Sequence, residues 1–236
     1  MKKTLRHIKG AIYSLTLFEK LLWLVSELAV IISFAFLPSP NPLTLAASII
    51  GLTALIFTAK GDVMGQILII IFSLLYAAVS FGERYYGEMI SYVFMSGGIA
   101  VFSTVAWIKH PYREHQVRVG RLTKRSLSFI VASTVAVTVS FYFILKLLGT
   151  ANLLFSTLSI ATSFIASSLT VRRSPFYALA YAVNDVVLIV LWVLAAIGEP
   201  ANAPMIVCFL AFLVNDLYGF TNWIRMKNAQ KITERS

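Results

Sequence analysis

Two long apolar segments of the chain, 177–197 and 203–223, contain the same polar pattern. In each of them Val-Asn-Asp is followed by a tryptophan seven residues after the aspartate. Residues at this spacing lie about two helical turns apart, so the carboxylate and the indole share one face of a helix. Carboxylates accept hydrogen bonds, amides donate and accept them, and indoles stack on flat or cationic rings. The pattern therefore favours binding of a sugar joined to a flat aromatic base.

Other polar residues accompany this pattern. Two follow the aspartate on a neighbouring stripe of segment 203–223, and a weaker polar set lies in segment 63–81. We therefore predict a substrate-binding site and assign no catalytic residue. Its predicted members are Asn184, Asp185, Trp192, Asn215, Asp216, Tyr218, Asn222, Trp223, Tyr76 and Gln66.

The cost of placing acids in apolar segments supports this prediction. An aspartate at the centre of a membrane helix costs about 2.5–3.5 kcal/mol on insertion scales, so such groups face a bundle interior or a wet cavity. An alternative is that the Asn-Asp pairs join helices through hydrogen bonds, each contributing about 0.6–2 kcal/mol. For the tryptophans, the alternative is an aromatic belt at the membrane surface.

The cysteine and histidine residues of the sequence do not predict a metal site or redox chemistry. The single cysteine, Cys208, lies in an apolar run and has no partner for a disulfide within the chain. The three histidines, His7, His110 and His115, all fall in basic segments. We therefore expect no metal site and no cofactor.

The bulk composition is that of a membrane protein. Of the 236 residues 58% are hydrophobic and only 13% are charged, and the mean hydropathy is +0.82. Soluble domains carry about 25% charged residues, so neither a water-soluble globule nor a disordered chain fits. The fold class predicted is all-α, a polytopic membrane protein.

Eight segments have the length of about 20 apolar residues that a membrane-spanning helix requires. Helices are the expected structure because the hydrocarbon core offers no water to the backbone. Glycine, proline and polar residues separate most of the segments. They are 21–37, 43–59, 63–81, 88–108, 128–149, 151–171, 177–197 and 203–223.

The basic residues predict the orientation. With a cytoplasmic N-terminus, all but two of the twenty Lys and Arg residues fall in segments on the cytoplasmic side, and the exceptions are Arg84 and Lys146. This asymmetry follows the positive-inside rule and places both termini in the cytoplasm. It also explains the net charge of +10 without a nucleic-acid partner. A signal peptide is the competing interpretation of the first 37 residues, but their apolar run is long for one and lacks a clear cleavage site.

An internal repeat appears when the sequence is shifted by 116 residues. Tyr76 then aligns with Trp192, 82–83 with 198–199, and Trp107 with Trp223. Such parallel repeats are a transporter architecture with the site between the repeats. The predicted division is 1–42 (basic N-terminus and extra helix), 43–127 (first three-helix repeat and cytoplasmic connection), 128–150 (linker helix), 151–225 (second repeat) and 226–236 (cytoplasmic tail).

The runs 184–192 and 212–223 resemble the PnuC family of bacterial vitamin transporters, whose type members carry nicotinamide riboside. The sequences at 59–61, 107–109 and 172–173 give weaker support. The family's Trp-x-x-Trp pair corresponds here to Tyr177 and Ala180.

The resemblance implies a 3+1+3 fold similar to the SWEET sugar transporters, assembled as a homotrimer. It also implies facilitated diffusion of a B-vitamin precursor, with nicotinamide riboside as the expected substrate, across the bacterial inner membrane, with trapping by cytosolic phosphorylation. Relatives are assigned to thiamine or riboflavin, so these and other nucleoside-like compounds are alternative substrates.

Two other function classes remain as alternatives. The intramembrane aspartates could form the acid and base of a proteolytic dyad, although their flanking residues do not resemble known intramembrane aspartyl proteases. A membrane scaffold or receptor would pack the same polar faces dry, with no cavity. We expect a transporter and not an enzyme.

Overall fold

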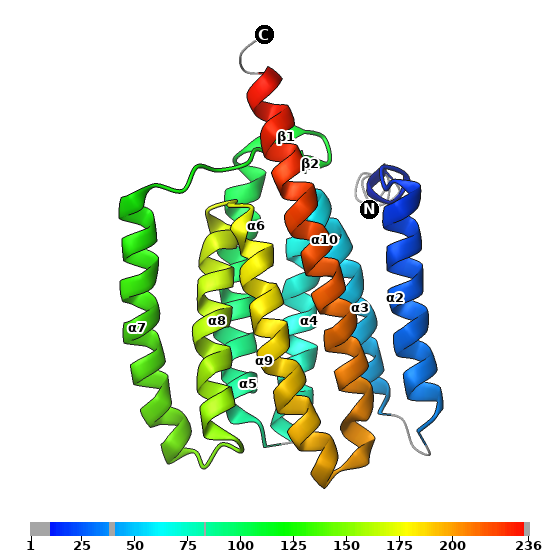
Figure 1. Ribbon diagram of the computed structural model, residues 1–236, viewed down its shortest axis with the longest axis vertical. Helices are drawn as coiled ribbons and strands as arrows, with labels where there is room; N and C mark the ends of the chain where they lie inside the picture. Colours follow the sequence, from blue (N-terminus) through cyan, green and yellow to red (C-terminus); the bar gives the residue numbers. More distant parts are fainter. Residues whose placement is uncertain (1–9, 38–40, 83, 234–236) are drawn as a thin grey trace.

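The computed structural model describes residues 10–37, 41–82 and 84–233 of the chain. The basic residues 2–9, the Pro38–Pro40 break, Glu83 and the last residues of the tail lie outside this part. The described residues are helical except for turns and one short β-hairpin (Figure 1). The elements are α2 (Leu17–Ala35), α3 (Pro42–Lys60), α4 (Val63–Gly82), α5 (Tyr86–Ile90), the π-helix η1 (Ser91–Gly98), α6 (Ile99–Ile108), β1 (Pro111–Arg113), β2 (Gln116–Val117), α7 (Lys124–Leu147), α8 (Leu153–Val171), α9 (Phe176–Gly198), the 3₁₀ turn η2 (Pro200–Asn202) and α10 (Ala203–Thr233).

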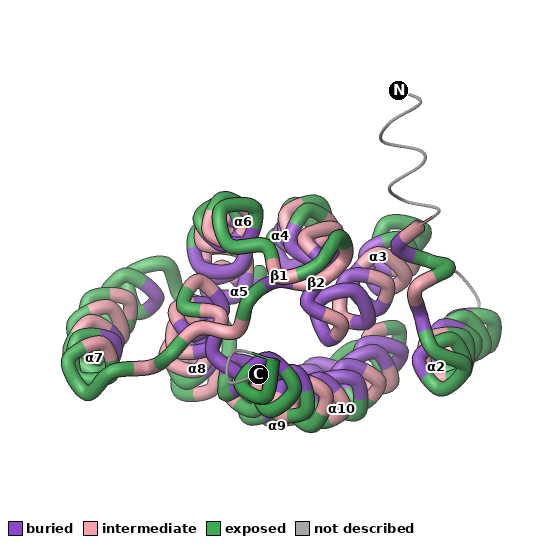
Figure 2. The backbone as a smooth tube through the Cα atoms, turned by 90° about the horizontal axis from the view of Figure 1, so that it is seen from above, coloured by how far each residue is buried: buried purple, intermediate pink, exposed green. Residues whose placement is uncertain are grey.

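The helices form two facing rows, seen from above in Figure 2. One row holds α3, α4 and the segment α5–η1–α6, and the other holds α8, α9 and α10. The rows meet at both ends, where α10 packs on α3 and α6 packs on α8. Helix α7 lies against α8 at one edge, and α2 contacts α3 and α10 at the other. The buried faces of the two rows therefore enclose the centre of the bundle.

Seven helices within the described residues are long and apolar enough to cross a membrane. The eighth expected segment does form a helix, α2, but Glu19, Lys20 and Glu27 interrupt its apolar sequence, and it is not among the seven. Glu27 faces the protein, because its Oε1 accepts hydrogen bonds from Trp23 Nε1 and Thr53 Oγ1, both at 3.0 Å. Helix α7 is largely exposed, as expected for a helix that faces lipid, and buries only Ile130, Thr134 and Leu145.

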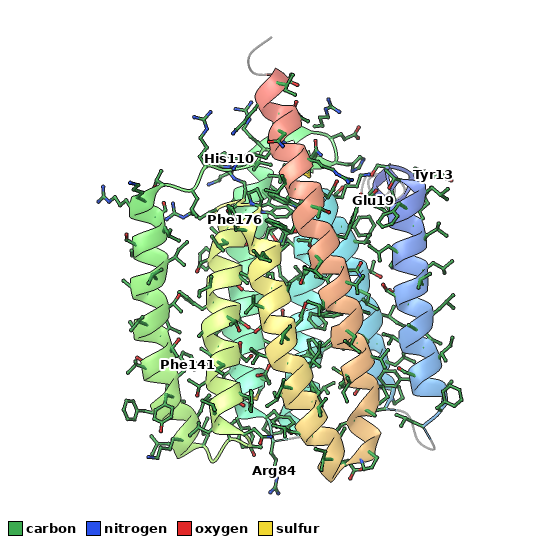
Figure 3. All side chains as sticks on the ribbon, viewed as in Figure 1. Tyr13, Glu19, Arg84, His110, Phe141 and Phe176 are labelled. Carbon is green, nitrogen blue, oxygen red and sulfur yellow. The ribbon has the colours of Figure 1, made fainter. Side chains whose placement is uncertain are left out.

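Basic groups mark one end of the bundle. Figure 3 shows His110 at the end from which α10 projects, and Arg84 at the opposite end. The connection between α6 and α7, predicted only as a polar loop, contains the β1–β2 hairpin at this basic end.

Local chemistry explains the differences from the predicted boundaries. Helix α2 begins four residues before the predicted position 21, because Thr16 and Glu19 form a capping box. Helix α10 continues ten residues beyond the predicted position 223, because Gln230 stays buried. The Gln230 side chain accepts a hydrogen bond from Val119 N at 2.8 Å and donates one to Val117 O at 3.1 Å.

The expected continuous helix 88–108 is interrupted by a π-helical segment, η1. Two glycines end this segment, and a Cβ added to Gly97 would lie 3.0 Å from the Ser73 Cβ of α4. Glycine at this position therefore allows close packing, while the π-helix alters which side chains of η1 face the bundle interior. Such π-helical segments often occur at functional sites.

Candidate functional site

Asp185 of α9 and Asp216 of α10 face each other in the bundle interior. Both side chains are buried, and both line the same cavity. The short η2 turn makes α9 and α10 adjacent helices, which brings the two Val-Asn-Asp patterns to the same depth.

A narrow cavity of about 40 Å³ adjoins this carboxyl pair. A buried water needs roughly 10–15 Å³ measured in this way, so the space holds a few waters. Polar groups and aromatic rings from α3, α4, η1, α9 and α10 meet at its wall. The lining residues are Gly51, Leu55, Thr58, Ile69, Phe72, Tyr92, Ser96, Tyr177, Tyr181, Asn184, Asp185, Phe212 and Asp216.

Asn184 lines the cavity beside the carboxyl pair, as the sequence pattern suggested. Its Oδ1 accepts hydrogen bonds from Thr162 Oγ1 at 2.7 Å and Ser163 Oγ at 3.0 Å, both on α8. Because the oxygen is occupied by α8, the amide nitrogen is the group that this side chain can offer to another acceptor.

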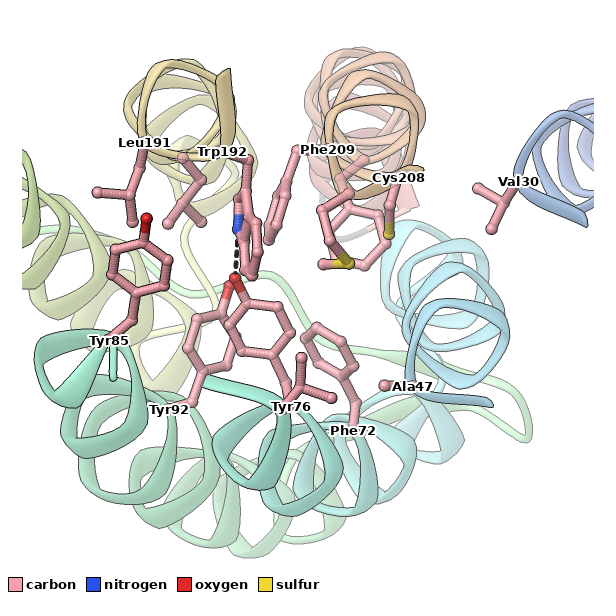
Figure 4. Close-up of a cluster of buried hydrophobic side chains, with 14 of the residues drawn as sticks. Val30, Ala47, Phe72, Tyr76, Tyr85, Tyr92, Leu191, Trp192, Cys208 and Phe209 are labelled. Atoms are coloured by element: carbon pink, nitrogen blue, oxygen red, sulfur yellow. Dashed lines mark hydrogen bonds between the residues drawn. The ribbon is translucent and has the colours of Figure 1, made fainter. Parts of the chain in front are cut away.

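Tyr76 and Trp192 stand behind the aromatic wall of the cavity. The Trp192 Nε1 donates a hydrogen bond of 2.7 Å to the Tyr76 hydroxyl, and Figure 4 shows the two side chains pointing toward each other from α4 and α9. The Tyr76 ring lies 4.1 Å from the Tyr92 ring and 5.5 Å from the Phe72 ring, measured between centroids. On this side, Phe72 and Tyr92 therefore line the cavity, whereas the predicted pair, Tyr76 and Trp192, does not.

Trp223 and Gln66 are buried but do not line this cavity. Trp223 Nε1 donates a hydrogen bond of 2.9 Å to Thr58 O at the end of α3. Its ring packs against Trp107 and Tyr177 with centroids 5.4 and 5.0 Å apart. Trp223 thus supports the wall from behind, and neither tryptophan of the repeated pattern lies at the surface as an aromatic belt would require.

The remaining three predicted residues point elsewhere. Asn215 Nδ2 donates a hydrogen bond of 2.9 Å to Ser26 Oγ, which joins α10 to α2. Tyr218 and Asn222 line a separate cavity of about 480 Å³ at the basic end of the bundle. There the Tyr218 hydroxyl donates a hydrogen bond of 2.9 Å to Glu19 Oε1. The structure therefore brings Asn184, Asp185 and Asp216 together and leaves these three outside the central cavity.

Comparison with known proteins identifies the family. The model of the nicotinamide mononucleotide transporter family matches residues 41–225. The chain belongs to this family. It is therefore a multi-pass membrane transporter, and the resemblance predicted from 184–192 and 212–223 is confirmed.

Relatives of this transporter agree with the assignment. The nicotinamide riboside transporter PnuC of Neisseria mucosa is 26% identical over 212 residues, covering 86% of this chain and 80% of that protein. The protein of the same name from Haemophilus influenzae is 24% identical over 198 residues, covering 82% and 84%. The crystal structure of the vitamin B3 transporter PnuC has a TM-score of 0.80 at 24% identity, covering 92% of this chain and 94% of that one. This structural likeness establishes the fold.

The transporter's central cavity also contains residues that the sequence interpretation did not select. Tyr177 and Tyr181 precede Asp185 at intervals of four residues, the spacing of one helix face, so periodicity could have identified them. The Tyr181 hydroxyl lies 2.9 Å from Ser167 Oγ. A further buried acid, Glu88 of α5, lies outside the lining of this cavity, and the sequence placed it only at the start of the expected helix 88–108.

The placement of Asn215 predicts that alanine substitutions of the two repeated asparagines will affect substrate affinity differently. Asn215→Ala removes the hydrogen bond to Ser26 and should cost about 1 kcal/mol of stability while substrate affinity stays at the wild-type value. Asn184→Ala, the matched change in the other pattern, should lower the affinity. Equilibrium binding and thermal unfolding of the purified variants measure both effects. An equal loss of affinity in the two variants would contradict the placement.

Proposed function

We propose that this transporter carries nicotinamide riboside across the bacterial inner membrane and binds it in the central cavity. The observation that carries the proposal is the buried pair of Asp185 and Asp216 within a partly aromatic wall. The carboxyl groups and Asn184 suit ribose hydroxyls and the nicotinamide carboxamide, because they combine acceptors with an amide donor. Phe72 and Tyr92 offer rings to the positively charged nicotinamide ring. The names of the two relatives point to the same substrate.

The electrostatics of the cavity favour the riboside over the mononucleotide. Two acids line it, and none of the described residues in its wall is Lys, Arg or His. A phosphate group would add about −1.5 to −2 charges beside these acids at neutral pH. Repulsion and the cost of burying an unpaired charge would oppose its binding. A cationic riboside meets neither penalty.

Entry of a nucleoside requires the cavity to widen, since the present 40 Å³ holds only a few waters. We propose that the two three-helix units, 43–108 and 151–225, rock against each other around the carboxyl pair, with α7 as the linker and α2 as an additional eighth membrane helix. Residues 116 apart meet at two places, since Tyr76 contacts Trp192 and Trp107 contacts Trp223. Contacts between equivalent residues are expected near an axis that relates two repeats, and they support the SWEET-like arrangement.

The remaining features of the proposal follow from the resemblance and the charge asymmetry. Both termini lie in the cytoplasm, the assembly is a homotrimer, and transport is facilitated diffusion with phosphorylation of the substrate in the cytosol. The concentration of basic residues at one end of the bundle supports the orientation, since basic segments favour the cytoplasmic side.

Competition for uptake into proteoliposomes tests the substrate. Labelled nicotinamide riboside should enter wild-type vesicles, and unlabelled riboside should inhibit this uptake at concentrations at least tenfold lower than nicotinamide mononucleotide, because about 1.4 kcal/mol of repulsion suffices for that ratio. Thiamine, riboflavin and unphosphorylated nucleosides serve as competitors in parallel. If thiamine or riboflavin were transported in preference, that vitamin would replace nicotinamide riboside as the proposed substrate. Stronger inhibition by the mononucleotide than by the riboside would contradict the electrostatic argument.

A further inference from the structure

A third cavity, of about 330 Å³, lies at the basic end of the bundle, apart from the transport site. It is formed where the connection between α6 and α7 meets the turn between α8 and α9 and the last turns of α10. Five basic side chains and no acidic one are among the described residues that line it. The lining residues are Arg118, Val119, Gly120, Arg121, Arg173, Lys227, Gln230 and Lys231.

Backbone contacts hold these three segments in place. Gly120 N donates a hydrogen bond of 2.9 Å to Arg173 O. The approach is so close that a Cβ at Gly120 would lie 2.1 Å from Arg172 O. On the other side, the buried Gln230 side chain bonds to the backbone of Val117 and Val119. The cavity is therefore a built feature of the fold, in contrast to a group of mobile surface lysines.

Among the basic residues that the structure describes in this cavity, Arg173 has a guanidinium group that lacks hydrogen-bond partners. Its backbone has a left-handed φ of 54°, an uncommon conformation for a residue with a side chain. Its Nε and Nη1 atoms are buried and have no hydrogen-bond partner in the described structure. Burial, with the neighbouring Arg118, lowers the pKa of Arg173. An oxyanion in the cavity would supply partners for the two nitrogens and offset the repulsion between the cations.

We propose that this cavity binds a phosphate group. The planar guanidinium of Arg173 presents its donors in the fork that matches phosphate oxygens, and Lys227 adds a point charge from α10. The phosphate can belong to the headgroup of an anionic phospholipid or to a small soluble molecule. Either ligand would tie the connection between α6 and α7 to the turn between α8 and α9 and to the last turns of α10.

The test uses the full-length protein in nanodiscs and measures the temperature of thermal unfolding. In phosphatidylcholine discs, sodium phosphate and sodium pyrophosphate are titrated against sodium chloride of equal ionic strength. In a second arm without added phosphate, phosphatidylglycerol replaces part of the phosphatidylcholine. Stabilisation by phosphate in neutral discs identifies a soluble ligand, whereas stabilisation only by phosphatidylglycerol identifies a lipid headgroup.

Two variants with equal loss of charge assign the effect to the cavity. Arg173→Gln/Lys227→Gln should weaken the response at least tenfold, whereas Arg113→Gln/Lys124→Gln, which removes one Arg and one Lys outside the cavity, should respond as the wild type does. Arg173→Lys keeps the charge and loses the fork, so it should also weaken binding, and it serves as the second test if the double variant does not fold. No response to phosphate or phosphatidylglycerol in the wild type would overturn the proposal, as would equal responses in the two double variants.

Discussion

Replacing Asp185 by alanine is expected to abolish uptake of nicotinamide riboside. The change removes one of the two carboxyl groups from the wall of the cavity, and with it a hydrogen-bond acceptor for the substrate. Hydrogen bonds to charged groups contribute about 1.5–3 kcal/mol each, so the loss of one weakens substrate binding by about tenfold to a hundredfold. Radiolabelled uptake by cells that carry equal amounts of each variant in the membrane measures the effect.

The control for this change is Val183→Ala on the same helix. Val183 is 51% exposed on the outer side of α9, so its truncation should leave uptake unchanged. Asp185→Asn keeps an amide that can donate to Asp216 and loses the negative charge, so we expect an intermediate affinity. Full uptake by the alanine variant would remove Asp185 from the site.

Replacing Trp192 by alanine is expected to destabilise the fold more than any other single change discussed above. The indole is fully buried, donates to the Tyr76 hydroxyl and packs edge-on against Tyr85. Truncation of a buried aromatic residue costs about 3–5 kcal/mol in soluble proteins, through the cavity that it leaves. The purified variant should therefore unfold at a clearly lower temperature.

Trp192→Phe separates packing from substrate contact. Phenylalanine refills most of the space and loses only the hydrogen bond to Tyr76, so it should recover most of the stability and most of the uptake. If Trp192→Ala unfolded at the wild-type temperature and yet transported nothing, the indole would contact the substrate directly, as the sequence pattern predicted.

The sequence predicted that Asn184, Asp185 and Asp216 lie close together, because their geometry is local. Asn184, Asp185 and Asp216 lie on two consecutive helices joined by a short turn, so similar depth and adjacency follow from helix length alone. The family resemblance rested on the same residues, and it is confirmed.

Which way the other polar faces of α10 point depends on helix packing, which the sequence does not reveal. Helix α10 contacts α2, α3 and α9, so three of its faces are covered. Asn215 lies on a face of α10 that contacts α2. Tyr218 lies on a face of α10 that points toward the basic end of α2 and α3. Polarity alone cannot distinguish a stripe that lines a cavity from one that joins two helices.

The sequence pattern also did not predict the π-helix η1. Its apolar residues fit an α-helix equally well, and in the structure the segment packs against α4 and α8. Tyr92 and Ser96 lie within it and reach the cavity. Their contribution to the site therefore depends on a backbone irregularity that no periodicity predicts.

An experimental structure of the protein with nicotinamide riboside bound would test most directly whether the substrate binds beside Asp185 and Asp216. We expect density for the ligand between α9, α10 and η1, with the ribose beside Asp185 and Asp216 and the cavity wider than 40 Å³. Density only in the cavity that Tyr218 and Asn222 line, with the central cavity beside the two aspartates empty and unchanged, would contradict this expectation.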